Sequence, residues 1–195
     1  MTFIAEAGRS LKGAWLLFAD RADALAHFNV SRAGFYRSFA AFFIALPFYL
    51  VTIHFEQGQP VAVPGGIILD GSGAWGSRLI ALALTWLALP ALLRLAARPL
   101  AIEATYRQFV IARNWASVLV SIPYAIVAPL RTVAGTGGEL GEILALATLF
   151  LVVRFLYLVA RRALGAGLVL AVFIVAASLL LGWLIDAAAG ALIPF

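Results

Sequence analysis

The feature that most constrains this chain is a set of five apolar runs that approach or reach the length needed to cross a lipid bilayer. About 20 residues of helix span roughly 30 Å of hydrocarbon. The first two runs are short, so they need flanking side chains that reach the interface. Together the runs predict an all-α integral membrane protein with five transmembrane helices, at residues 38–52, 77–93, 108–130, 140–160 and 168–187.

Composition and charge support this class and predict an orientation. The chain is 64% hydrophobic and only 12% charged, which leaves too little polar surface for a soluble domain. With a cytoplasmic N-terminus, the inner side receives twelve basic and four acidic residues, and the outer side two basic and five acidic. Loops rich in lysine and arginine stay inside. We therefore expect a multi-pass protein of a bacterial inner (cytoplasmic) membrane, with an extracytoplasmic C-terminus.

The N-terminal region, residues 1–30, precedes the transmembrane domain at residues 31–195 and has the pattern of an amphipathic cytoplasmic helix. Its acidic and basic side chains nearly cancel, so burial of the apolar stripe must provide the binding. The helix would lie in the inner interface or against the bundle, or dock a partner. Ser31 is a suitable N-cap for a first membrane helix that starts near Arg32. The stripe comprises Ile4, Ala7, Leu11, Trp15, Phe18, Ala22 and Leu25.

Polar residues interrupt the third and fourth runs. At spacings of three, four and three, one face of the third run carries Asn114, Ser117, Ser121 and Tyr124, with Arg113 beside them. In the fourth run Arg154 lies seven residues, about 10 Å of helix, inside Arg161. Asn114 and Arg154 should therefore sit at a similar depth, where a hydrogen bond can join them. These residues form the candidate polar, lipid or partner site.

Arg154 needs a physical reason for its position, because an arginine at mid-span costs about 2.5–3.5 kcal/mol on insertion scales. Three roles compete. The side chain can snorkel past Tyr157 toward Arg161 and contact lipid phosphate. It can be held by backbone carbonyls and the Asn114 face as a structural brace. It can also line a path for a substrate or ion.

Two further patterns concern packing. Pro123 frees the carbonyl of Leu119 near the middle of the third run, and such a kink either opens a cavity or improves packing. The last run has a small-residue face suited to close helix contact, within the bundle or in a homodimer. That face comprises Ala171, Ser178, Gly182 and Ala189.

Enzymatic and nucleic-acid functions lack the required residues. His27 and His54 fall on opposite sides, no acidic pair sits within a run, and the chain has no cysteine. Basic residues lie at membrane boundaries and do not form a stripe with aromatics. We expect no catalysis, cofactor, metal or nucleic acid.

The outer loop at residues 54–76 has the composition of a hairpin, a segment that dips into the interface, or an irregular loop. Tyr106, Trp115 and Tyr157 suit the inner interface.

Two short segments resemble those of Yip-domain proteins, including small five-span bacterial members of that family. The first is Phe35-Tyr36-Arg37-Ser38-Phe39, which enters the first run; the second is Phe109 with Arg113-Asn114-Trp115, which enters the third. The resemblance implies a non-enzymatic integral membrane protein. The eukaryotic members of that family are associated with membrane trafficking and small GTPases. We do not extend this trafficking role to a bacterial protein.

The sequence leaves two function classes open. The first is a scaffold or accessory subunit that packs against lipids or a larger membrane complex. Its partners would be membrane lipids, with anionic headgroups at the cytoplasmic face, and a membrane protein complex or a homo-oligomer. The second is a small transporter or channel with a polar path along the third run near Arg154.

Overall fold

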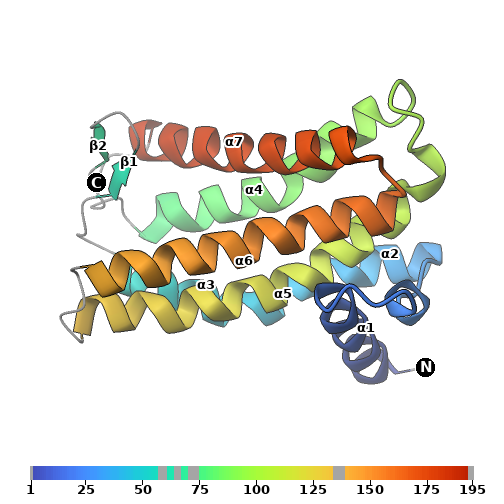
Figure 1. Ribbon diagram of the computed structural model, residues 1–195, viewed down its shortest axis with the longest axis horizontal. Helices are drawn as coiled ribbons and strands as arrows, with labels where there is room; N and C mark the ends of the chain where they lie inside the picture. The colour runs from blue at the N-terminus through green and yellow to red at the C-terminus, as the bar shows by residue number, and fades with distance from the viewer. Residues whose placement is uncertain (1, 57–60, 64–66, 70–74, 134–138, 193–195) are drawn as a thin grey trace.

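Five long apolar helices lie side by side in the computed structural model, which describes residues 2–56, 61–63, 67–69, 75–133 and 139–192 (Figure 1). Each is long and apolar enough to span a membrane, which confirms the predicted fold class at this level. The first comprises α2 (Arg32–Ser38) and α3 (Ala41–Glu56). The others are α4 (Trp75–Ala96), α5 (Glu103–Val133), α6 (Glu139–Leu164) and α7 (Leu168–Leu192).

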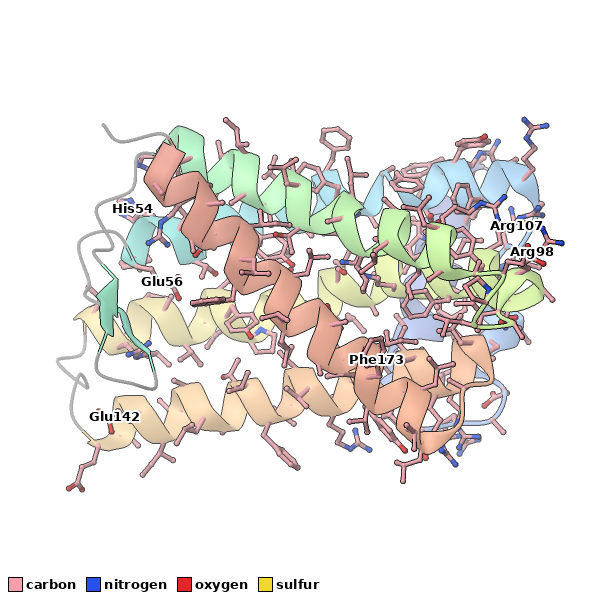
Figure 2. The ribbon with its side chains drawn as sticks, turned by 90° about the horizontal axis from the view of Figure 1, so that it is seen from above. His54, Glu56, Arg98, Arg107, Glu142 and Phe173 are labelled. Atoms are coloured by element: carbon pink, nitrogen blue, oxygen red, sulfur yellow. The ribbon has the colours of Figure 1, made fainter. Side chains whose placement is uncertain are left out.

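Helix α5 extends beyond its apolar run because polar turns continue it at both ends, from Glu103 and through Thr132. Helix α2 begins at Arg32, as expected, and the Ser31 hydroxyl accepts a hydrogen bond from the Gly34 amide at 3.1 Å. Figure 2 shows Arg98 and Arg107 at one end of the bundle, and His54, Glu56 and Glu142 at the other. We call the first the arginine-rich end; its helix termini and turns carry Arg32, Arg94, Arg98, Arg107, Arg161 and Arg162.

Helix α5 is the centre of the bundle. It packs against α3 and α6 along its length and is also contacted by α1, α2 and α4. Phe109, Val110 and Trp115 are buried on it, so Trp115 is a core residue and not the interfacial anchor that its position suggested. Helix α4 packs chiefly against α7, as the upper layer of Figure 1 shows.

The N-terminal helix α1 (Phe3–Phe18) is shorter than the sequence pattern suggested. It ends before Asp20, whose φ of 56° lies in the left-handed region that Asp tolerates, and a 3-10 turn, η1 (Ala24–His27), follows. Ala22 and Leu25 are therefore outside the helix. Figure 1 shows α1 at the same end of the bundle as α2, crossing the direction of the long helices.

The face of α1 that packs on the bundle is rotated by roughly a quarter turn from the predicted apolar stripe. Its buried residues include Glu6, Ser10, Gly13 and Leu17, while Ile4 and Trp15 are 82% and 60% exposed. Small residues allow close approach, and Gly13 lies against His27 and Ala24 of η1. Of the predicted stripe, Ile4 and Trp15 are thus left on the outside of the molecule, whereas Ala7 is buried and Leu11 and Phe18 are partly buried.

The small-residue face of α7 lies within the bundle. Ala171 and Ala189 are buried, and a Cβ at Gly182 would stand 3.7 Å from the Thr85 methyl group on α4. Ser178 lines a small cavity between α7 and its neighbours. These contacts join α7 to neighbouring helices of the same chain, and the homodimer role stays a prediction.

The loop between α3 and α4 contains a short hairpin. Strands β1 (Val61–Val63) and β2 (Ile67–Leu69) pair antiparallel, with Val61 opposite Leu69 and Val63 opposite Ile67. The hairpin was one of the expected forms. The rest of the loop between Glu56 and Trp75 lies outside the described residues.

The close contact at Gly34 gives a prediction for the N-terminal packing. A Cβ at position 34 would overlap the backbone carbonyl oxygen of Asn29, whereas a Cβ at Gly8 of α1 meets nothing within 4 Å. We expect Gly34→Ala to destabilise the protein by about 1–3 kcal/mol, because the backbone must move. The matched Gly8→Ala should be neutral or slightly stabilising. Unfolding of both variants in detergent measures the difference, and equal stabilities would contradict the packing.

Candidate functional site

The polar stripe on α5 is satisfied largely by the protein itself. Asn114 is fully buried, and its amide donates to the Ser38 hydroxyl of α2 at 3.0 Å; Ser38 in turn donates to the Phe35 carbonyl at 2.7 Å. The hydroxyls of Ser117 and Ser121 donate to carbonyls of their own helix. Tyr124 is half-buried. These side chains connect α5 to α2 or bond locally, which is typical of contacts between packed helices.

Arg113 is a buried cation of the bundle. Its side chain donates to the Trp86 carbonyl at 3.0 Å and the Thr85 carbonyl at 3.4 Å, both on α4. Pro90 lies four residues after Trp86 and has no N–H, so the Trp86 carbonyl lacks its helical donor. The arginine supplies that donor from a neighbouring helix. No described carboxylate forms an ion pair with Arg113.

Two buried polar atoms near this interface have no hydrogen-bond partner in the described part of the chain: the Trp86 indole nitrogen and the Asn114 side-chain oxygen. A separate cavity of about 10 Å³, beside Arg113 and Ser178, has room for about one water molecule. The remaining lining is apolar, from α4, α5, α6 and α7. This space is too small for a substrate.

Helix α1 is held to the bundle by a buried carboxylate. Glu6 is 3% exposed; it accepts a hydrogen bond from the Asn29 amide at 3.0 Å and pairs with Arg37 of α2 at 2.9 Å. Sequence patterns did not reveal this ion pair. The available signal was the spacing of Glu6 with Ser10, Gly13 and Leu17, which places the carboxylate on a small-residue face.

Arg154 contacts α1 and not Asn114. Its guanidinium donates to the Phe18 carbonyl at 2.9 Å and lies 5.4 Å from the centroid of the Phe18 ring. The backbone brace was one of the three expected roles, but the carbonyl belongs to the C-terminal turn of α1. A cation there also complements the negative end of the helix dipole. Arg154 and Asn114 therefore serve different contacts.

A second arginine of α6 binds Asp20, two residues after the end of α1. Arg162 bonds Asp20 at 2.8 Å through two of its nitrogens. The hydrogen bond from Arg162 lowers the pKa of Asp20 below its usual value; the charges of Arg162, Arg154 and Arg161 act in the same direction, and desolvation opposes them. One carboxylate thus stands among three arginines at the end of α1.

An apolar groove opens beside these arginines. It has a volume of about 180 Å³ and lies between α1, α5 and α6. Pro123 and Leu119 are part of its wall, so the groove lies at the proline-interrupted part of α5, where a cavity was one expected outcome. Its lining consists of Trp15, Phe18, Leu119, Val120, Ile122, Pro123, Leu151, Val152 and Phe155.

Comparison of the chain with protein-family models, with curated proteins and with solved structures finds no match. The functional argument therefore rests on the geometry of these contacts.

The bond from Arg113 to Trp86 predicts an energetic coupling with Pro90. Arg113→Met removes the donor and leaves the Trp86 carbonyl unpaired in an apolar interior. Pro90→Ala restores a backbone N–H for that carbonyl. We expect Arg113→Met to lower the free energy of unfolding by about 1 kcal/mol less in the Pro90→Ala background than in the wild-type background. Unfolding of the two single variants and the double variant in one detergent measures this coupling.

A control removes the same kind of side chain at an exposed position. Arg98 is exposed and lies at the arginine-rich end (Figure 2), so Arg98→Met should show no coupling to Pro90→Ala. Additive effects of Arg113→Met and Pro90→Ala would show that the arginine does not replace the missing helical bond.

The contact between Asp20 and Arg162 predicts a pH dependence. Because the pKa of Asp20 is lowered in the folded protein, its contribution to stability is present above the unfolded value, about 3.9, and is lost as pH falls through the folded value. We expect Asp20→Asn to lower the Tm at pH 7, and the difference from wild type to shrink below about pH 4. Asparagine tolerates the positive φ, so the backbone is preserved. A difference that is constant from pH 3 to 7 would contradict the contact.

Proposed function

We propose that this chain is a non-enzymatic integral protein of a bacterial cytoplasmic membrane, where it acts as a scaffold or accessory subunit that packs against lipids or a larger membrane complex. In this proposal the five apolar helices are inserted, the arginine-rich end faces the cytoplasm, and the C-terminus is extracytoplasmic. The orientation follows from the excess of basic residues at that end. A relationship to Yip-domain proteins is part of the same proposal.

The distribution of apolar side chains supports insertion. The least buried of the five long helices, α7, is the most hydropathic, and the most buried, α5, is the least. Water would favour the opposite order, because exposed helices of soluble proteins carry polar faces. Large apolar side chains cover the outside, including Phe173 on α7, which is 61% exposed (Figure 2). Such a surface is compatible with lipid or another membrane protein.

The observation that carries the choice of a scaffold over a transporter is the internal use of the polar groups. Arg113, Asn114, Ser117 and Ser121 bond to protein atoms. The space beside Arg113 has room for about one water molecule, and Arg154 is engaged by α1. A transporter needs a hydrated path along such residues. The alternative of a small transporter or channel therefore has the weaker support.

Helix α1 offers a surface for partners at the arginine-rich end. One face is fixed to the bundle through Glu6, and the apolar residues Ile4 and Trp15 remain exposed. Lys12 is exposed as well, and it is the single lysine of the chain. A helix with one face on the bundle, one apolar face outward and one polar face suits the membrane interface beside a companion protein.

The test is gentle extraction of the protein from its native membranes, followed by native mass spectrometry. We expect companion proteins in a fixed stoichiometry with the chain. In inverted vesicles, a membrane-impermeant amine-reactive cross-linker should couple Lys12 to the cytoplasmic part of a companion. In intact spheroplasts the same reagent should leave Lys12 unmodified.

Lys12→Arg is the matched control, because it keeps the charge and removes the reactive amine. Modification of Lys12 in intact spheroplasts would overturn the orientation. A chain that is released alone, without companions under any mild condition, would overturn the accessory role.

A further inference from the structure

The groove between α1, α5 and α6 combines two properties that rarely occur together at a helix contact. Its lining is apolar, and its volume of about 180 Å³ exceeds the roughly 150 Å³ that admits benzene in an engineered protein cavity. Its edge carries positive charge, since the Arg154 guanidinium lies 5.4 Å from the centroid of the Phe18 ring that lines the groove. The space can hold a short stretch of a hydrocarbon chain.

The positive charge near the groove is compensated only in part, since the single carboxylate of Asp20 stands against three arginines. Arg154 and Arg161 are separated by seven residues, so they lie on one face of α6, about 10 Å apart along the axis. Both are exposed, and neither pairs with a carboxylate of the described chain. The carboxylate in this cluster, Asp20, bonds Arg162. Arg161 and the remaining donors of Arg154, which uses one nitrogen on the Phe18 carbonyl, can therefore bind an anion.

The positions of the groove and the arginines along α6 match the shape of a phospholipid. Arg161 is near the C-terminal end of α6, Arg154 is two turns further in, and the groove residues Leu151 and Val152 are deeper still. A headgroup at the arginines would place an acyl chain alongside Leu151, toward the middle of the helix. The exposed Trp15 ring covers part of the same groove from α1.

We propose that this groove binds one acyl chain of an anionic phospholipid whose phosphate is held by Arg154 and Arg161. The inference rests on the proposed membrane location, and it adds a defined lipid site to it. Arg154 then serves two contacts, one to the Phe18 carbonyl and one to the lipid. The bound lipid would cover the exposed edge between α1 and the bundle.

The experiment uses the full chain in mild detergent, with native mass spectrometry to measure binding of phosphatidylglycerol and of zwitterionic phosphatidylcholine. We expect phosphatidylglycerol to bind more tightly. Arg161→Gln should weaken it about fivefold, as expected for one arginine at an anionic headgroup. Val120→Phe fills the groove and should weaken it by about fourfold for each methylene displaced.

Each variant has a control of the same chemistry away from the groove. Arg98→Gln removes a charge at the arginine-rich end, and Val169→Phe enlarges a residue that is 83% exposed on α7. Both should bind phosphatidylglycerol like wild type. Arg161→Gln leaves the described contacts of α1 intact, so a loss of binding in this variant reports on the headgroup and not on folding.

Equal binding of the two lipids, or variants indistinguishable from their controls, would overturn the site. These results are separable from the accessory role. If companion proteins are found but phosphatidylglycerol binds no more tightly than phosphatidylcholine, the proposed function stands and the groove site is rejected. If phosphatidylglycerol binds selectively but no companion proteins are found, the groove site stands and the accessory role is rejected.

Discussion

A polar group buried among apolar side chains is costly unless another protein atom hydrogen-bonds to it. This constraint explains the arrangement around α5. Pro90 leaves the Trp86 carbonyl without its helical donor, and Arg113 crosses from α5 to supply one. Asn114 reaches Ser38 in the same way. The helix with the most polar face is accordingly the one that its neighbours enclose most fully.

The arginine-rich end follows a different physical rule, because its charged groups bind a separate helix and do not repair a break. Glu6 is buried against Arg37, Arg162 bonds Asp20, and Arg154 bonds the last turn of α1. The contacts come from α2 and α6, so α1 bridges elements that are distant in the sequence. Their combined effect is to hold an apolar helix face at the margin of the bundle, beside the groove.

The five long helices could be predicted because length and apolar composition are local properties. Contacts between helices could not, because periodicity shows which residues share a face and not what that face meets. The stripe of α1 illustrates this limit: small residues and Glu6 pack inward, and Trp15 stays outside. Arg154 is the isolated charge of its apolar run in the sequence, yet Arg113 is the more deeply buried arginine in the structure. Recognising its role required knowing that α4 and α5 are neighbours.

The pairing of α4 with α7 has a consequence for how the chain is made. Two helices, α5 and α6, are synthesised between them, so α4 emerges long before the surface that covers it. During that interval α4 has its contacts with α3 and α5, among them the bond from Arg113 to the Trp86 carbonyl, but not those with α7. Assembly of this layer is therefore completed only when α7, the last helix, is made. A ribosome that stalls after α6 leaves a nascent chain in which the α7-contacting surface of α4 is uncovered.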